Sequence, residues 1–319
     1  MLKKYRVQLD ICTLCNLDCP SCGMRHLNYG NIGAGYISFE NYKLFIDKNK
    51  EYIKNIEISN SGEPFLNPDI LKILEYSYKN NIELTCKNGT NFNFENDDLI
   101  KALVDYQFSL IYVAIDGASQ ETYSKYRRKG NFNLVIDNIR KLNLYKQEKN
   151  SEYPKLVWQY IVRDSTENPE EIKKAIELAN ELNMQMYFKL TWEKFYKPTP
   201  EWIPEIKALT GMEYLTRAEV PPTHEHWQFH KCLTLCNYKK IVVNWDGRWL
   251  GCCANKNPSD LNLFKISLPE LFNSDLYKRT LEYLLDNRTD NIDDIFCNKC
   301  PTLARVNRLE LGPILKTKL

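Results

Sequence analysis

The first 190 residues alternate short apolar runs with amphipathic segments, and this rhythm restricts the chain to an α/β fold. Helical patterns separate the apolar runs, which predicts parallel strands joined by right-handed crossovers. A complete eight-unit barrel needs about 250 residues, so six units favour a partial, open (β/α)6 barrel. The six candidate strands are Arg6–Ile11, Asn55–Ser59, Glu83–Lys87, Ile111–Ile115, Leu156–Val162 and Gln185–Leu190.

Three sequence signals predict where helices begin. Asn67 and Asn168 suit the N-cap position, and the proline that follows each of them suits the first helical position. Ser267 begins a capping box, which predicts a further helix running to about Leu285.

The β/α rhythm stops after residue 192, which predicts three regions. We assign residues 1–192 to the barrel. Residues 193–230 are rich in proline, histidine and tryptophan, and we expect them to link the regions and to cover part of the site. Residues 231–319 are predicted to form a small C-terminal domain. In it, Ile241–Asn244 and Trp249–Leu250 flank an Asp-Gly turn signal and predict a hairpin.

Composition and charge exclude several classes of protein. The formal net charge of +2 gives no electrostatic reason to bind nucleic acid or an anionic membrane. No apolar run reaches about 18 residues, and the N-terminus lacks the apolar core of a signal peptide. We therefore expect a cytoplasmic protein. In a reducing compartment the eleven cysteines are metal ligands or reactive thiols rather than disulfides.

The first cysteine cluster has the spacing CxxxCxxC and follows the first candidate strand. Its members are Cys15, Cys19 and Cys22. Three thiolates on one short loop can bind three irons of a [4Fe–4S] cluster and leave the fourth iron open. A structural zinc site is the alternative, because Cys12 could complete a set of four ligands.

This spacing resembles the radical S-adenosylmethionine (SAM) superfamily. The resemblance implies that SAM binds the open iron through its amino and carboxylate groups. An electron from the cluster would then cleave SAM to a 5′-deoxyadenosyl radical. The family often has an aromatic residue before the third cysteine, where it packs near the adenine. Here that residue is Ser21, so an adenine contact must come from elsewhere or be absent.

Further segments resemble motifs of the same superfamily, in order, at the ends of successive strands. Ser61-Gly62-Glu63-Pro64 resembles the GGEP turn that meets the amino group of SAM, and Gly62 would let the backbone approach a ligand closely. The resemblance also places an Asn-Gly turn near the ribose, an aspartate as ribose acceptor, and Arg127 or Arg128 beside the SAM carboxylate. The implied SAM contacts are Ser61, Gly62, Glu63, Pro64, Asn88, Asp116, Arg127, Gln159 and Arg163.

The second cysteine cluster resembles the shortened, Twitch form of a SPASM domain. That resemblance implies one auxiliary [4Fe–4S] cluster, with Cys232 as a competitor for the first ligand position. The implied ligands are Cys236, Cys252, Cys297 and Cys300. A four-cysteine zinc site is the alternative that the spacing also permits.

Cys253 stands beside an implied ligand, and in radical SAM epimerases a free cysteine supplies a hydrogen atom to the substrate radical. We therefore expect hydrogen abstraction from a peptide or sugar, followed by epimerisation with Cys253 as donor. The alternatives are a dehydrogenase or a peptide cross-linking maturase that uses the auxiliary cluster as electron acceptor. A zinc-binding module without enzymatic activity is a third. A flavodoxin or ferredoxin would supply electrons, and the segment His224–His230 could hold a metal or line a pocket.

Overall fold

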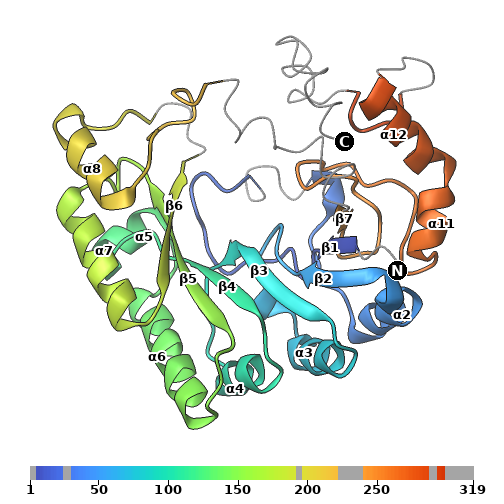
Figure 1. Cartoon of the computed structure of the whole chain (residues 1–319), viewed down its shortest axis with the longest axis horizontal. Helices are drawn as coiled ribbons and strands as arrows, with labels where there is room; N and C mark the ends of the chain where they lie inside the picture. The colour runs from blue at the N-terminus through green and yellow to red at the C-terminus, as the bar shows by residue number, and fades with distance from the viewer. Residues whose placement is uncertain (1–4, 24–29, 192–195, 222–239, 287–292, 299–319) are drawn as a thin grey trace.

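The computed structural model describes residues 5–23, 30–191, 196–221, 240–286 and 293–298. Its centre is a seven-stranded sheet in the order β6-β5-β4-β3-β2-β1-β7, and every neighbouring pair is parallel. The sheet curves into the open barrel that the six β/α units predicted (Figure 1). The strands are β1 (Tyr5–Leu9), β2 (Ile53–Glu57), β3 (Glu83–Thr90), β4 (Leu110–Ala114), β5 (Lys155–Val162), β6 (Gln185–Leu190) and β7 (Lys240–Val243).

The seventh strand lies in the segment that the sequence assigned to the C-terminal domain. β7 pairs in parallel with β1, with Val7 opposite Ile241. It also forms one arm of the predicted hairpin, because Val243 makes an antiparallel bridge with Trp249. Residues 240–243 are therefore part of the barrel sheet.

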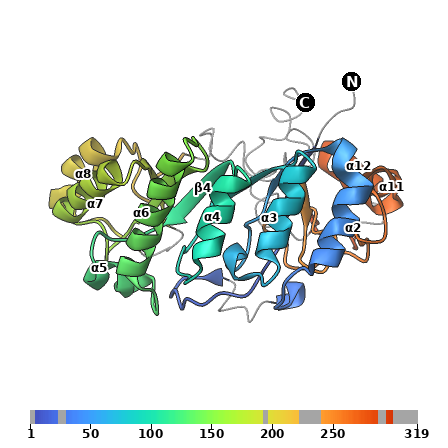
Figure 2. The same ribbon diagram turned by 90° about the horizontal axis from the view of Figure 1, so that it is seen from below.

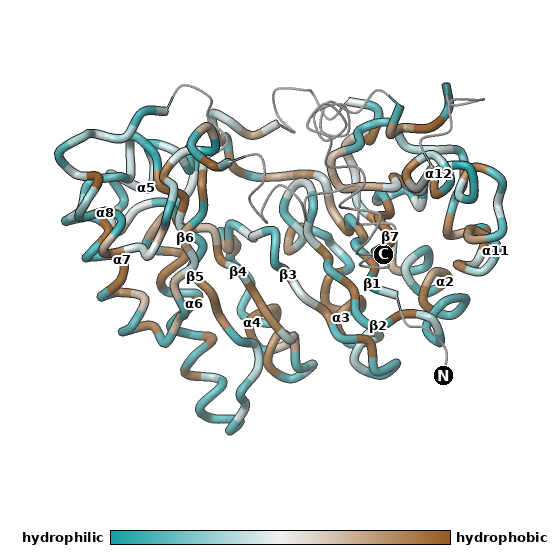
Figure 3. The backbone as a smooth tube through the Cα atoms, turned by 45° about the horizontal axis from the view of Figure 1, so that its top comes forward, coloured by the Kyte–Doolittle hydropathy of each residue, from teal (hydrophilic) through white to brown (hydrophobic). Residues whose placement is uncertain are grey.

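Helices cover the outer face of the sheet, where α2, α3, α4 and α6 lie side by side (Figure 2). Hydrophobic residues concentrate along the strands, whereas the outer turns of α6 are hydrophilic (Figure 3). None of the described helices is both long and apolar enough to cross a membrane. The α-helices are α2 (Phe39–Asn49), α3 (Ile70–Lys79), α4 (Asp97–Asp105), α5 (Gln120–Tyr126), α6 (Phe132–Glu148), α7 (Pro169–Glu181), α8 (Ile203–Thr210), α11 (Leu268–Asn273) and α12 (Asp275–Asp286).

Two of the predicted helices differ from expectation, while Asn168 caps α7 as predicted. The helix expected to start after Asn67 begins at Ile70. The Asn67 amide instead donates to the carbonyls of Ile11 and Ile37, at 2.7 and 2.9 Å. The helix that starts at the Ser267 capping box is interrupted at Ser274, whose backbone is extended. Two helices, α11 and α12, therefore replace the single predicted one.

Candidate functional site

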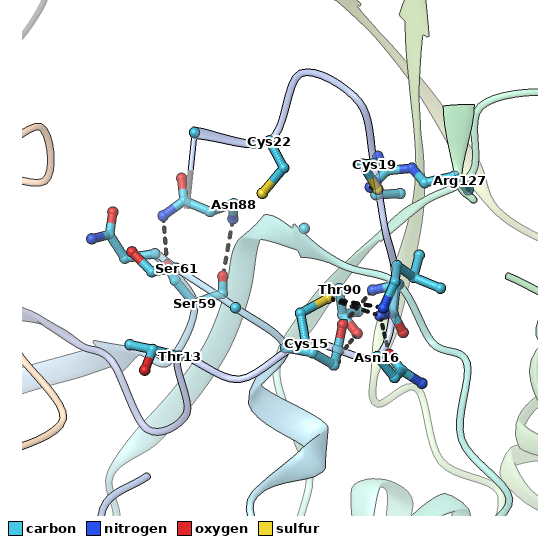
Figure 4. Close-up of a pocket in the computed structure, with 18 of the residues that line it drawn as sticks. Thr13, Cys15, Asn16, Cys19, Cys22, Ser59, Ser61, Asn88, Thr90 and Arg127 are labelled. Carbon is cyan, nitrogen blue, oxygen red and sulfur yellow. Dashed lines mark hydrogen bonds between the residues drawn. The ribbon is translucent and has the colours of Figure 1, made fainter. Parts of the chain in front are cut away.

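The loop that follows β1 carries the first cysteine cluster, and it is held by backbone contacts on both sides. Thr13 N–H donates to the Gly35 carbonyl (2.8 Å), and Asp18 N–H donates to the Arg128 carbonyl (2.9 Å). Cys15, Cys19 and Cys22 border one cavity of about 640 Å³ at the carboxyl ends of the strands (Figure 4). The loop therefore presents three thiols to a common space.

Cys12 does not belong to this group. Its side chain is buried, and its Sγ donates to the Leu14 carbonyl at 3.8 Å. Among the residues that the structure describes, no three His, Cys, Asp or Glu side chains converge as ligands of a single metal ion would. Three thiols around a shared cavity suit a cluster, in which each thiolate binds a different iron. The donor set thus fits the iron–sulfur interpretation better than zinc with Cys12.

The surroundings of Cys15 and Cys19 disfavour their thiolate forms. Burial raises the pKa of Cys15 to about 12, with a further contribution from the Glu63 carboxylate. Burial also raises the pKa of Cys19, although the Arg127 guanidinium opposes that rise. Because thiolates are the metal-binding form, loading the site releases protons. Asn91, which the sequence analysis did not single out, directly follows β3, and its Nδ2 lies 3.6 Å from Cys15 Sγ.

The turn Ser61–Pro64 packs against the start of the cysteine loop. Gly62 has φ +71°, and a Cβ there would lie 2.3 Å from the Thr13 carbonyl carbon. The close approach that requires glycine is therefore to the chain's own backbone, whereas we had expected a ligand. Ser61, Gly62 and Glu63 line the cavity. Pro64 is buried and begins a short 3-10 helix below it.

Glu63 is buried, and its carboxylate is already engaged by the end of β3. It accepts hydrogen bonds from the Thr90 hydroxyl (2.5 Å) and from Asn91 N–H (2.6 Å). Burial raises the pKa of Glu63 to about 7, against the effect of these hydrogen bonds. Asn88 also lines the cavity, and its amide donates to the Ser59 carbonyl at 2.6 Å.

Asp116 differs most from its expected position. It is fully buried and does not border the cavity. One carboxylate oxygen accepts from Ile161 N–H (2.8 Å), and the other accepts from Arg127 Nε (2.7 Å). These contacts indicate that Asp116 orients Arg127, whereas the resemblance implied a contact between Asp116 and the ribose.

Arg127 borders the cavity, whereas Arg128 is exposed. Arg127 Nη1 lies 3.8 Å from Cys19 Sγ. Burial opposes the charge of Arg127, but the neighbouring Asp116 carboxylate holds its pKa above the ordinary value. Of the two arginines that the sequence offered, only Arg127 is among the residues that line this cavity.

Ser21 has an aromatic neighbour that the sequence did not reveal. The hydroxyls of Ser21 and Tyr126 lie 2.8 Å apart, and Tyr126 borders the cavity. The guanidinium of Arg163 stacks on the Tyr126 ring, 3.4 Å from its centroid, and Nη1 lies 3.5 Å from Ser21 Oγ. Arg163 therefore contacts the aromatic ring and is not among the residues that line the cavity, whereas Gln159 of β5 is one of them.

The segment after β7 also reaches the site. Lys256 lines the cavity, with Nζ 3.4 Å from Ser61 Oγ. Cys253 is half-buried and is not among the cavity-lining residues. The sequence did not predict that Lys256 lies at the site, because Lys256 reaches Ser61 only through the folding of a distant segment.

The structure describes only part of the second cysteine cluster. Cys252 is half-buried and Cys297 is buried. Their neighbours Gly251 and Phe296 are in direct contact, since a Cβ on Gly251 would lie 1.9 Å from the Phe296 ring. The two segments therefore come together. The remaining residues of interest, Cys232, Cys236, Cys300 and His224–His230, lie outside the described residues.

Comparison with known proteins identifies the family. A family model described as the radical SAM superfamily matches residues 10–179. The chain therefore belongs to the radical SAM superfamily. It is accordingly an enzyme, and its family implies a [4Fe–4S] cluster and SAM. This membership overturns the alternative of a zinc-binding module without enzymatic activity.

Individual relatives are more distant. The chain is 29% identical over 174 residues to an AdoMet-dependent heme synthase of Methanosarcina barkeri, covering 54% of this chain and 46% of that protein. It is 27% identical over 143 residues to an uncharacterised protein of Methanocaldococcus jannaschii, covering 44% of this chain and 45% of that protein. The matches thus span less than half the length of these relatives.

Two solved structures share the fold. SuiB of Streptococcus suis bound to SAM has a TM-score of 0.61 at 14% identity, covering 94% of this chain and 71% of that chain. Native anSMEcpe with bound AdoMet has a TM-score of 0.55 at 14% identity, covering 97% of this chain and 99% of that chain. Both support the partial barrel.

Proposed function

We propose that the cavity binds SAM beside a [4Fe–4S] cluster held by Cys15, Cys19 and Cys22. In this proposal the enzyme cleaves SAM reductively and abstracts hydrogen from an unactivated C–H bond. The observation that carries it is the composition of the cavity wall. The three thiols share that wall with six of the nine expected SAM contacts, namely Ser61, Gly62, Glu63, Asn88, Arg127 and Gln159.

The chain's own residues would divide the binding of SAM between them. The bound cluster supplies the electron that breaks the carbon–sulfur bond. Arg127, oriented by Asp116, is suited to the SAM carboxylate because a guanidinium pairs well with that group. Tyr126 provides an aromatic ring next to Ser21, where the family motif lacks one. Asn88 and Gln159 offer amide groups to the hydroxyls and base of the nucleoside.

The test is 5′-deoxyadenosine formation by the anaerobically reconstituted, dithionite-reduced enzyme. The wild type and a Cys12→Ala control should form 5′-deoxyadenosine, since Cys12 lies outside the cavity. Cys15→Ala should not form it, and its iron content should fall. Undiminished 5′-deoxyadenosine formation by Cys15→Ala would contradict the assignment.

We infer a second, auxiliary cluster of the Twitch type, with Cys236, Cys252, Cys297 and Cys300 as ligands. The contact between Gly251 and Phe296 supports it, because it brings together the segments that carry two of these cysteines. Two [4Fe–4S] clusters require about eight irons per chain. Metal analysis that finds about four irons and one zinc per chain would favour the zinc alternative at this second site.

For the overall reaction we propose epimerisation of a peptide or sugar substrate, with Cys253 as hydrogen donor. A solved structure of Streptococcus suis SuiB contains the precursor peptide SuiA, and this favours a peptide over a sugar as the substrate class. A flavodoxin or ferredoxin would supply electrons, in a cytoplasmic setting.

Turnover in deuterated water separates the possible outcomes. Epimerisation through Cys253 places one deuterium in the product, and Cys253→Ala should lose this labelled product while Cys86→Ala retains it. Cys86 is the matched control because it is buried in β3. An oxidised, unlabelled product would instead indicate a dehydrogenase, and a product with a new bond between side chains would indicate a cross-linking maturase.

A further inference from the structure

Asn91 lines the cavity but has no assigned role in SAM binding. It directly follows β3, and Figure 4 shows Cys15 and Asn16 of the cysteine loop beside Thr90, the last residue of that strand. Asn91 is buried, with 5% of its surface exposed. Its Nδ2 lies 2.7 Å from Asn16 Oδ1 and 3.6 Å from Cys15 Sγ. An amide nitrogen carries two hydrogens, so it can donate to both of these atoms.

The surrounding hydrogen bonds determine which way the Asn91 amide points. Its Oδ1 accepts from Asn93 N–H at 2.8 Å, so the nitrogen is the atom that faces the cysteine loop. The Asn16 amide is oriented in the same way, because its Nδ2 donates to the Asn93 carbonyl at 2.7 Å and leaves Oδ1 to accept from Asn91. A rotated Asn91 amide would place its nitrogen against Asn93 N–H and its oxygen against Asn16 Oδ1. The network therefore directs a donor at the sulfur of Cys15.

The backbone of Asn91 is held as firmly as its side chain. Its N–H donates to the Glu63 carboxylate at 2.6 Å, and its carbonyl accepts from Asn93 Nδ2 at 3.2 Å. A second donor, Leu17 N–H, lies 3.5 Å from the same Cys15 sulfur. These contacts fix Asn91 at the cysteine loop, and they surround a cluster ligand with hydrogen-bond donors.

We propose that Asn91 donates a hydrogen bond to the Cys15 sulfur when the cluster is bound and so raises the reduction potential of that cluster. Reduction adds one electron from the external donor and converts [4Fe–4S]²⁺ to [4Fe–4S]⁺, while no bond of Asn91 is made or broken. The added negative charge is shared by the sulfur ligands, so a hydrogen-bond donor stabilises the reduced form more than the oxidised form. Asn91 acts through Cys15 and is therefore a positioning residue. This inference rests on the proposed function, and it concerns how readily the cluster accepts the electron that cleaves SAM.

Redox titration followed by EPR tests the inference in the reconstituted full chain. Asn91→Leu removes the donor at similar volume, and Asn91→Asp replaces it with an oxygen while keeping an acceptor for Asn93 N–H. Asn138→Leu is the matched control. Asn138 is also a buried asparagine, but its Nδ2 donates to the carbonyls of Phe92 and Phe94, and it is not among the cavity-lining residues. The cluster of interest is recognised by the change in its EPR signal when SAM is added, because SAM binds its open iron.

At a fixed potential, the ratio of reduced to oxidised cluster should fall about tenfold in Asn91→Leu. This is equivalent to a midpoint potential lower by about 59 mV. The potential should fall further in Asn91→Asp and keep its wild-type value in Asn138→Leu. A wild-type potential in both Asn91 variants, or an equal decrease in Asn138→Leu, would overturn the proposal.

If neither Asn91 variant binds iron, pulsed EPR of the reduced wild type decides. Enzyme that contains asparagine labelled with ¹⁵N only in its side chain should show coupling of an amide nitrogen to the cluster. The amides of Asn16 and Asn88 donate to backbone carbonyls, so Asn91 is the expected source of this coupling. Absence of the coupling would overturn the proposal. Formation of 5′-deoxyadenosine by the same wild-type sample reports separately on the proposed function.

Discussion

Breaking the buried ion pair between Asp116 and Arg127 should cost far more stability than breaking an exposed ion pair of this protein. The Asp116 side chain is fully buried, and that of Arg127 is 13% exposed. In Asp116→Asn the remaining oxygen can still accept from Ile161 N–H, but the new amide presents a donor to the Arg127 Nε donor. Breaking a buried pair in this way costs about 3–5 kcal/mol, because it leaves one charge buried and uncompensated.

Urea unfolding under anaerobic conditions, followed by tryptophan fluorescence, measures this loss in the free energy of unfolding. The matched control is Glu181→Gln, which breaks the pair between Arg140 and Glu181. Those side chains are 49% and 60% exposed, so the expected loss is at most about 1 kcal/mol. Equal losses in the two variants would refute the reasoning.

The same pair distinguishes two roles for Asp116. If Asp116 acts on SAM through Arg127, the double variant Asp116→Asn/Arg127→Met should bind SAM no more weakly than Arg127→Met alone. If Asp116 contacts the ribose itself, the two losses in binding free energy should add. Equilibrium dialysis with labelled SAM measures all three variants and decides between these results.

Three further predictions concern the cysteine loop and its surroundings. Gly62→Ala should lower the free energy of unfolding by at least about 2 kcal/mol and reduce iron content, because the new Cβ meets the Thr13 backbone. The control is Gly211→Ala, where φ is +67° but the space around the residue is open. That variant should lower the free energy of unfolding by about 1 kcal/mol. Burial raises the pKa of Asp10 from 3.8 to about 6, so the folded state keeps its proton to a higher pH than the unfolded state does. Stability is therefore lost as the pH rises from about 4 to about 6. Urea titrations should show a decrease of about 3 kcal/mol in the wild type relative to Asp10→Asn. Tyr126→Ala should weaken SAM binding about tenfold by dialysis, while Tyr126→Phe keeps most of the affinity.

The six strands of the barrel could be predicted because each is a local apolar run between helical patterns. β7 was recognisable as a strand, but its position in the sheet was not. It pairs with β1, more than 230 residues earlier in the chain, and no local feature encodes that partner. The break at Ser274 was also missed. Its hydroxyl caps α12 by accepting from Tyr277 N–H, and it donates to the Leu271 carbonyl at the end of α11. Serine can also occupy a helix interior, so the residue type alone did not reveal this.

The same difference between local sequence patterns and contacts of distant segments applies to the site. The cysteines and the turns after β2, β3 and β4 could be grouped because the carboxyl ends of parallel strands share one edge of the sheet. Tyr126, Asn91 and Lys256 could not, because each reaches the cavity through a contact between distant segments. Asp116 shows the converse case. Its position after β4 suggested a ligand contact, but Arg127 on the next helix uses its carboxylate.

These tertiary contacts link the C-terminal segment to the cysteine loop. β1 is paired on one side with β2 and on the other with β7, and Asp10 N–H continues the second pairing by donating to the Val243 carbonyl (3.0 Å). Trp245 donates to the Ile32 carbonyl (2.8 Å), and its ring fills the space that a Cβ on Gly35 would need. Gly35 in turn binds Thr13 through its carbonyl, at the start of the loop. A displacement of the segment after β7 is therefore expected to disturb the backbone that leads to Cys15.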